Sequence, residues 1–192
     1  NNYKVVAVTR NIHQKGFELK TQANPGYLEL VELESLDEEK IKDLFNSCSV
    51  CINLIGILYE KNKGQFNKIH SVLPNILSKI AKEKKIDQFI HVSALGVENA
   101  TNSVYAKSKL DGENNVKKNF KNSLILKPSI VYGIDDNFTT NFMSLLSKLP
   151  IMPLYYNGET KFVPIHVSDL AEIIYQMLSL IHISEPTRRI EI

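Results

Sequence analysis

Hydrophobic and polar residues follow two different rhythms along this chain, one typical of strands and the other of helices. Residues 49–58 are almost continuously apolar, as strands are when a parallel sheet buries them on both faces. Four further apolar segments bounded by turn-forming residues also predict strands. These are residues 3–10, 27–35, 86–96 and 123–133.

The segments between these strands carry the spacing of helices. In residues 65–85 the apolar side chains recur every three or four positions, which places them on one face. They are Phe66, Ile69, Val72, Ile76 and Ile80. Residues 35–45 and 104–120 also predict helices, and the first opens with Ser35 and Glu38 at capping-box spacing. Strands that alternate with such helices predict an α/β fold with a doubly wound parallel sheet.

A doubly wound sheet binds its ligands at the carboxyl ends of its strands. Four of the predicted strands end in small or polar residues, which let a ligand approach the backbone closely. These ends are Thr9 with Arg10, residues 53–56, residues 93–96 and residues 127–133. We expect all four to lie on one rim and to form the groove of a dinucleotide cofactor.

Tyr105 and Lys109 are four residues apart in the helix predicted for residues 104–120, so they share one face of it. A nearby ammonium group favours the phenolate form of tyrosine, which eases proton transfer to or from a substrate hydroxyl. Ser93 ends the preceding strand, where its hydroxyl can bond the same substrate oxygen. The spacing alone also fits a solvated helix face, but the position after a strand that ends in serine favours a catalytic group.

The composition limits the classes of protein to which the chain can belong. With 192 residues, 43% of them hydrophobic, it is long enough for a globular α/β domain. A net charge of +2 favours no nucleic-acid partner, and no apolar run reaches the roughly 20 residues of a transmembrane helix. Cys48 and Cys51 form a C-x-x-C pair, but no second pair completes a zinc site, and we predict no metal.

The two ends of the chain differ from the rest. From Leu178 the sequence reads LSLIHISEPTR, which matches the translation of an adapter used in transposase-based DNA sequencing libraries. We therefore expect residues 178–192 to be a non-native tail and residues 1–177 to form the domain. The chain opens as a turn and a strand without a starting methionine, so we expect the domain to be a fragment.

Several motifs together resemble one superfamily more specifically than the Tyr105 and Lys109 spacing does. They are INLIGILYE, KIDQFIHVSALG, YAKSKLDGE, ILKPSIVYGIDDNF and FVPIHVSDLAEII. From Tyr3 to about Met177 the chain resembles the extended and atypical short-chain dehydrogenases/reductases, the superfamily of NAD-dependent epimerases and dehydratases. Within it, the motifs are most similar to the nucleotide-binding accessory subunits of respiratory complex I and their bacterial relatives. The resemblance implies a Rossmann-like fold whose first strand, Gly-rich turn and first helix would precede Asn1.

The resemblance also implies residues that hold a nicotinamide dinucleotide. Arg10 takes the place where an acidic residue selects NAD and a basic residue accommodates the 2′-phosphate of NADP. We therefore expect NADP(H), with NAD(H) as the less favoured cofactor. Glu34 stands near the adenine, and Leu54, Ile55 and Gly56 line the adenosine side.

On the nicotinamide side the resemblance implies Ser93, Tyr105 and Lys109, the three residues that the spacing also singles out. Lys109 would reach the ribose hydroxyls as well. Pro128 and Ile130 would flank the carboxamide. The same three residues would be the catalytic ones if the protein turns over a substrate.

Two main classes of function fit these residues. One is a subunit that holds NADPH structurally in an assembly at the membrane, with respiratory complex I subunits as partners. The alternative is an active NAD(P)-dependent oxidoreductase, or a sugar-nucleotide epimerase or dehydratase, with Tyr105 as general acid and base. A regulator that senses NADP(H) occupancy is a third and weaker interpretation. We expect an intracellular location, cytoplasmic or peripheral at the inner membrane, on the matrix side in a eukaryote.

Overall fold

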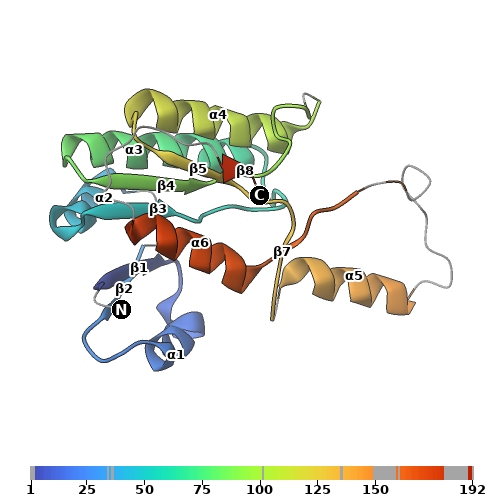
Figure 1. The fold of residues 1–192 in the computed structure, drawn as a ribbon, viewed down its shortest axis with the longest axis horizontal. Helices are drawn as coiled ribbons and strands as arrows, with labels where there is room; N and C mark the ends of the chain where they lie inside the picture. The colour runs from blue at the N-terminus through green and yellow to red at the C-terminus, as the bar shows by residue number, and fades with distance from the viewer. Residues whose placement is uncertain are drawn as a thin grey trace. The chain divides into compact units, whose positions relative to one another are not determined.

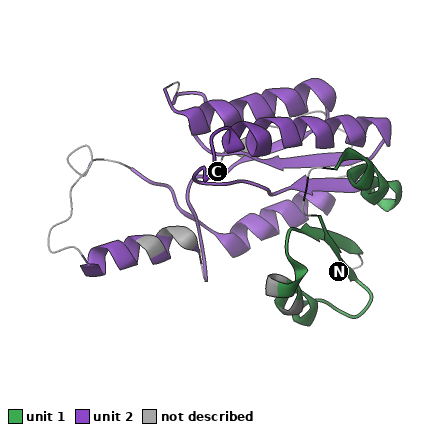
Figure 2. Ribbon diagram, turned by 180° about the vertical axis from the view of Figure 1, so that it is seen from behind, with its two compact units in different colours: residues 1–49 green, residues 50–192 purple. Residues whose placement is uncertain are grey.

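The computed structural model describes residues 3–33, 35, 37–100, 102–134, 136–148, 159, 161–179 and 190–191. The chain divides into two compact units, Asn1–Ser49 and Val50–Ile192, which Figure 2 shows in different colours. Parallel strands alternate with helices in each unit, which confirms the predicted α/β class. Among the described residues, no helix is both long enough and apolar enough to cross a bilayer.

The first unit opens with a strand, a helix and a second strand. Strands β1 (Val5–Thr9) and β2 (Leu28–Glu32) pair in parallel. Helix α1 (Ile12–Gln22) connects them, and a Cβ added at Gly16 would come within 3.1 Å of Leu30 Cδ1 on β2. The sequence does not predict α1, because its residues are mostly polar and a glycine stands in its interior.

Helix α2 (Glu38–Leu44) follows, and the capping box predicted from Ser35 and Glu38 is wrong. Asp37 is the N-cap residue: one of its carboxylate oxygens accepts from two backbone N–H groups of the first turn, at 3.1 and 3.3 Å. Because the helix starts at Glu38, that side chain lies one residue after the cap rather than three. A 3₁₀ turn, η1 (Phe45–Ser47), ends this part of the chain.

The second unit contains a parallel sheet in the order β3-β4-β5-β8 (Figure 1). Its strands are β3 (Val50–Asn53), β4 (Gln88–Val92), β5 (Leu124–Lys127) and β8 (Ile190–Glu191). A separate parallel pair consists of β6 (Val131–Tyr132) and β7 (Ile165–His166). The helices are η2 (Asn67–Val72), α3 (Leu73–Glu83), α4 (Val104–Asn119), α5 (Asn137–Lys148) and α6 (Val167–Ser179).

Helices cover both faces of the β3-β4-β5 part of this sheet. On one face, Ile90 of β4 and Leu126 of β5 belong to one buried core cluster with Leu170 of α6. On the other face, the ring of Phe89 lies 6.1 Å from that of Phe120, which follows α4. Figure 1 shows α3 and α4 on one side of the sheet and α6 on the other. The doubly wound arrangement predicted from the alternation of elements is therefore confirmed.

The carboxyl ends of β3, β4 and β5 are neighbours in this sheet, as the predicted rim requires. The fourth strand end, Thr9 with Arg10, belongs to the two-stranded sheet of the other unit. The rim is thus confirmed for the three strands that pair with one another.

The helix predicted for residues 65–85 contains a π-helical segment, η2, directly before α3. Pro74 has no N–H group to donate to the carbonyl of His70, four residues earlier. Backbone bonds in η2 span five residues instead, as from Leu73 N–H to Lys68 O. Single π-helical turns of this kind are frequent at functional sites.

Two described parts of the structure fall within residues 178–192. Leu178, at the end of α6, packs against the core cluster, and strand β8 pairs with β5. The assignment of residues 178–192 to a non-native tail stays a prediction, as does the single domain of residues 1–177.

Candidate functional site

The candidate site lies where α4 packs against the carboxyl ends of β3 and β4. Side chains alternate along a strand, so Phe89 and Ser93 both point to the α4 face. Hydrogen bonding between β4 and β5 continues past the strand end, because Ser93 N–H donates to Leu126 O at 2.8 Å. This bond fixes the backbone at Ser93, whose side chain is buried.

Helix α4 presents Tyr105, Lys109 and Glu113 at intervals of four residues, on one face. Ser103 caps its start by accepting from Ala106 N–H at 3.2 Å. Lys109 is only 6% exposed, and its Nζ donates to the carbonyl oxygen of Val92 at 3.3 Å. The structure therefore places a buried lysine amine at the end of β4.

The loop after β3 comes close to this amine. A Cβ added at Gly56 would lie 3.3 Å from Lys109 Nζ, which is a tight contact, and 3.8 Å from His70 Nε2, which is an ordinary one. Leu54 and Ile55, which precede it, have 63% and 46% exposed side chains. These exposed apolar side chains are available to contact a ligand.

His70 of η2 joins this loop to helix α4. Its Nε2 accepts from Ile57 N–H at 3.0 Å, so its Nδ1 carries the proton and donates to Ser108 Oγ at 3.0 Å. Ser108 Oγ in turn donates to the carbonyl oxygen of Tyr105 at 2.7 Å. Burial and the nearby Lys109 ammonium lower the pKa of His70 to about 4, so the ring is neutral at pH 7.

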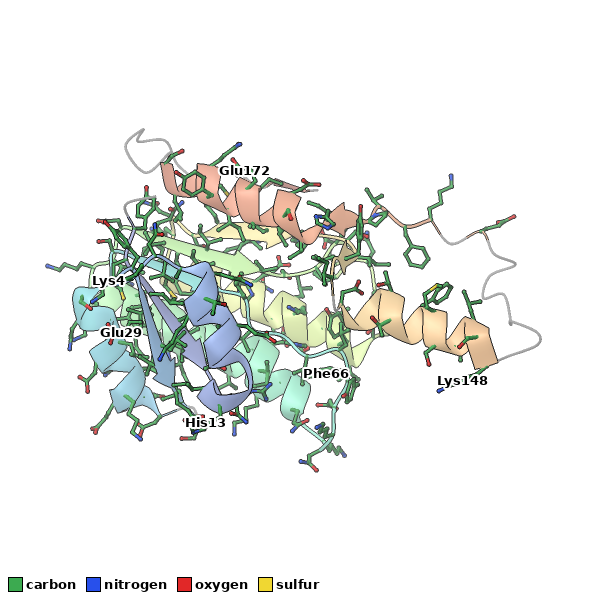
Figure 3. The ribbon with its side chains drawn as sticks, turned by 90° about the horizontal axis from the view of Figure 1, so that it is seen from below. Lys4, His13, Glu29, Phe66, Lys148 and Glu172 are labelled. Carbon is green, nitrogen blue, oxygen red and sulfur yellow. The ribbon has the colours of Figure 1, made fainter. Side chains whose placement is uncertain are left out.

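The ring of Tyr105 packs edge-on against two other rings. Its centroid lies 5.3 Å from that of His70 and 5.6 Å from that of Phe66, which stands at the start of η2 (Figure 3). Burial raises the pKa of Tyr105. The sequence predicts that the Lys109 ammonium favours the phenolate, whereas burial of the tyrosine in the ligand-free protein disfavours that charged form.

The amine of Lys109 is mostly protonated near neutral pH. Burial lowers its pKa to about 8, and the carboxylate of Glu113 opposes this change. An ammonium group has three donors, and the Val92 carbonyl accepts from one of them. The others suit acceptors such as ribose hydroxyls or phosphate oxygens.

The sequence motifs do not reveal which residues hold Ser93. Its Oγ donates to Glu113 Oε1 at 2.7 Å, and Lys127 Nζ lies 3.0 Å from Glu113 Oε2. A signal for this contact is present in the sequence, since Lys127 directly follows the apolar residues of strand β5 and a buried lysine requires an anionic partner. Glu113 supplies it one helical turn after Lys109.

Pro128 and Ile130, predicted to flank a carboxamide, lie just after β5. The carbonyl oxygen of Pro128 accepts from Leu95 N–H at 3.0 Å, and that of Ile130 accepts from Ile165 N–H at 2.9 Å. Ile130 also lines an open apolar cavity of about 300 Å³. The other lining residues are Tyr132, Thr139, Phe162 and Pro164.

Two predicted cofactor residues, Arg10 and Glu34, belong to the first unit. Arg10 directly follows β1, and its side chain is exposed. Glu34 lies outside the described residues. At the end of β2, Glu32 caps helix α1, because its Oε1 accepts from Ile12 N–H at 3.1 Å.

Known proteins share sequence with most of this chain. Over 154 residues it is 27% identical to the mouse (Mus musculus) mitochondrial protein named NADH dehydrogenase (ubiquinone) 1 alpha subcomplex subunit 9, covering 80% of the chain and 41% of that protein. The protein of the same name in Dictyostelium discoideum is 29% identical over 175 residues, which cover 90% of the chain and 48% of the relative. The chain thus spans less than half the length of either relative.

Solved structures share the fold at lower sequence identity. A UDP-glucuronic acid 4-epimerase from Bacillus cereus in complex with NAD superposes with a TM-score of 0.74 at 19% identity, over 100% of this chain and 70% of that one. A dTDP-4-dehydrorhamnose reductase from Bacillus anthracis in complex with NADP gives a TM-score of 0.66 at 16% identity. The match covers 100% of this chain and 75% of that one.

The family model described as "RmlD substrate binding domain" matches residues 60–189, more than half of the chain. Together with the relatives and the shared fold, this match confirms the resemblance to the epimerase and dehydratase branch of the short-chain dehydrogenases/reductases and to the complex I accessory subunit. The chain belongs to the RmlD substrate binding domain family.

Proposed function

We propose that this chain is the cofactor-binding part of an NAD(P)(H)-binding protein of the short-chain dehydrogenase/reductase superfamily. The observation that carries the proposal is Lys109, a buried amine at the carboxyl end of β4, beside Gly56 in the loop after β3. Open parallel sheets bind dinucleotides at this edge, and the remaining donors of the ammonium suit ribose oxygens. The NAD and NADP complexes among the structural neighbours support the same class of cofactor.

Within this class we propose a preference for NADP(H) over NAD(H). The support is Arg10, an exposed guanidinium that directly follows β1, where the superfamily contacts the adenosine ribose. A guanidinium pairs with a phosphate group through charge-assisted bonds, whereas a carboxylate in its place would repel the 2′-phosphate.

We further propose that the cofactor is held structurally, in a subunit that associates with respiratory complex I at the inner membrane, on the matrix side in a eukaryote. The relatives named as NADH dehydrogenase subunits support this role. Two features of the site point the same way. The pKa of Tyr105 is raised rather than lowered, and the Ser93 hydroxyl already donates to Glu113.

The alternative is an active NAD(P)-dependent oxidoreductase, or a sugar-nucleotide epimerase or dehydratase, which would use Ser93, Tyr105 and Lys109. The observation that favours it is that α4 and the end of β4 carry all three residues at one side of the sheet. In that case Tyr105 would transfer the proton, and the nicotinamide would carry the hydride.

Titration of the full-length protein with NADPH and NADH tests the proposed function. We expect NADPH to bind about tenfold to a hundredfold more tightly, because charge-assisted bonds to a phosphate contribute roughly 1.5–3 kcal/mol. Arg10→Ala should abolish this difference. Lys20→Ala, which removes an exposed charge from the same unit, should preserve it.

The same titration separates the parts of the proposal. Equal affinities of the unsubstituted protein for the two cofactors would refute the preference for NADP(H). The absence of binding to either one would refute the cofactor site itself.

A further inference from the structure

A cluster of charged side chains lies buried beneath the candidate site. Glu113 of α4 is 0% exposed and Lys127 of β5 is 2% exposed. The two face each other across the gap between helix and sheet, with 3.0 Å between Glu113 Oε2 and Lys127 Nζ. Neither residue is among those that the motifs single out for cofactor binding or catalysis.

Burying a carboxylate is costly unless charged partners and hydrogen bonds compensate it. Glu113 has such partners on both sides: Lys127 from the sheet, and Lys117 at 3.5 Å from its own helix. Lys127 is held in place by a second carboxylate: its contact with Glu113 Oε2 is an ion pair without a hydrogen bond, and its Nζ donates to Glu98 Oε2 at 3.0 Å. The Glu113 carboxylate is therefore paired with cations from β5 and from its own helix.

This carboxylate determines how the Ser93 hydroxyl is oriented. The Oγ of Ser93 and the Oε1 of Glu113 are 2.7 Å apart, and a carboxylate can only accept. The hydroxyl proton of Ser93 therefore points at Glu113. The Ser93 oxygen can then only accept hydrogen bonds from any other partner, through its lone pairs.

The same carboxylate also favours the charged form of Lys109, which lies one helical turn away. The charged and titratable groups around Lys109 are His70 from η2, His91 from β4, and Tyr105 and Glu113 from its own helix. His70 and His91 are neutral at pH 7, because burial lowers their pKa values to about 4 and about 3. Glu113 is the group whose charge favours the ammonium form.

We propose that Glu113, held by Lys127, is a positioning residue of the cofactor site, which turns the Ser93 hydroxyl proton away from the ligand and keeps Lys109 charged. The proposal assigns to the site a serine that accepts hydrogen bonds and a lysine that donates them. It rests on the proposed function only for the identity of the ligand, since both effects exist in the ligand-free protein.

The first test uses the ligand-free, full-length protein. The titration of the Lys109 side chain is followed by NMR, and its signal is identified by its loss in Lys109→Arg. We expect a midpoint near pH 8 in the unsubstituted protein, and one lower by about one unit or more in Glu113→Gln. Lys118→Ala, which removes an exposed charge of the same helix and leaves Glu113 and its partners in place, should give a midpoint within a few tenths of a unit.

Glu113→Gln leaves Lys127 buried opposite a neutral amide, so this variant is at risk of not folding. The double variant Glu113→Gln, Lys127→Met removes both charges at similar volume and should fold. A decrease in the same direction but smaller is expected in it, because the loss of the Lys127 cation opposes the effect of losing the carboxylate. An unchanged midpoint in the folded variants would overturn the proposal, whether or not any dinucleotide binds.

The second test measures the link between Ser93 and Glu113 by NADPH binding. Ser93→Ala is compared in the unsubstituted protein and in the Glu113→Gln, Lys127→Met background. We expect the loss of affinity caused by Ser93→Ala to differ by about twofold or more between the two backgrounds, because residues in contact are coupled. Equal losses would overturn the positioning role, whereas no NADPH binding by the unsubstituted protein would refute the proposed function instead.

Discussion

Lys109 combines burial with positive charge in a single side chain. Its four-carbon stem lies inside the α4 and β4 packing, and its amine reaches the Val92 carbonyl at the strand end. Burial lowers its pKa to about 8, and Glu113 partly restores the charged form. A lysine held in this way is pre-positioned to donate to a ligand, because it loses little conformational freedom on binding.

Substitution of Lys109 tests this role directly. Lys109→Ala should weaken NADPH binding by about tenfold to a hundredfold, since it removes charge-assisted hydrogen bonds of roughly 1.5–3 kcal/mol. Isothermal titration of the full-length protein measures the change. Lys118→Ala, at an exposed position of the same helix, is the matched control and should bind like the unsubstituted protein. Normal affinity in Lys109→Ala would contradict the site.

Tyr105 separates the binding role from the enzymatic one. Tyr105→Phe keeps the ring that packs against His70 and Phe66 and removes only the hydroxyl. We therefore expect NADPH binding to be nearly unchanged. If the protein is an enzyme, the loss of general acid and base catalysis should reduce turnover by about 10²–10⁴-fold. In a structural subunit, neither cofactor occupancy nor assembly should change, and a large loss of either would argue against both interpretations.

At the residue scale, the sequence can identify the side chains that belong to a motif but not their partners. Ser93, Tyr105 and Lys109 stand at recognisable spacings. Glu113 and Lys127 come from a helix and a strand whose contact depends on the packing of α4 against β5. The raised pKa of Tyr105 also depends on burial, which spacing alone does not determine.

Among the elements, η2, α3 and α4 form the layer that holds the site against the sheet. Polar side chains of α4 bond to side chains of its neighbours: Asn115 Nδ2 donates to Ser71 Oγ at 3.2 Å, and Asn119 Nδ2 donates to Asn75 Oδ1 at 2.9 Å. Gly112, on the same helix face, allows the two backbones to approach closely, since a Cβ there would overlap the His70 carbonyl oxygen.

We predict that Gly112→Ala destabilises the protein despite the higher helix propensity of alanine. The added methyl group would push α4 away from η2, at a cost of about 3 kcal/mol in the free energy of unfolding. Urea denaturation followed by circular dichroism measures this loss. Asn114→Ala, at an exposed position of α4, should change the free energy by at most about 0.5 kcal/mol. A Gly112→Ala variant of unchanged stability would show that the two helices separate easily.

The elements that the sequence predicts correctly are those with a strong periodic signal. The apolar strands β3, β4 and β5 and the amphipathic helix α3 belong to this group. Helix α1 has a weak signal, because its residues are mostly polar. The predicted cap of α2 is wrong because Ser35 and Glu38 have the spacing of a capping box, whereas the residue that caps the helix is Asp37, two positions after Ser35.

For the molecule as a whole, alternation of strands and helices predicts a doubly wound sheet, and the second unit has one. It does not predict how strands group into sheets: β1 and β2 pair in the first unit, whereas β3, β4 and β5 pair in the second. The pattern of side chains in β1 and β2 fits a sheet of two strands as well as one of five, because each strand specifies only its own buried face.

Two histidines buried beneath the site give the whole protein a defined response to acid. His91 Nδ1 accepts from Asn53 Nδ2 at 3.1 Å, and His70 Nε2 accepts from the Ile57 N–H group at 3.0 Å. Burial is the main cause that lowers their pKa values, to about 3 for His91 and about 4 for His70, from 6.5. Between pH 6.5 and pH 4 the unfolded chain therefore binds protons at both rings while the folded chain binds few.

Stability should consequently fall as the pH decreases from about 6.5 to about 4. Each histidine contributes at most about 1.4 kcal/mol per pH unit to this slope, and the pair about 2.7 kcal/mol. We predict that His70→Gln removes the contribution of His70 to this slope. The His70→Gln, His91→Gln variant should remove the contributions of both histidines. Urea unfolding at pH 7, 6, 5 and 4.5 measures the slope, which is independent of any stability lost equally at every pH. An identical slope in the double variant would mean that neither ring is held neutral by burial, and that the acid response comes from other groups instead.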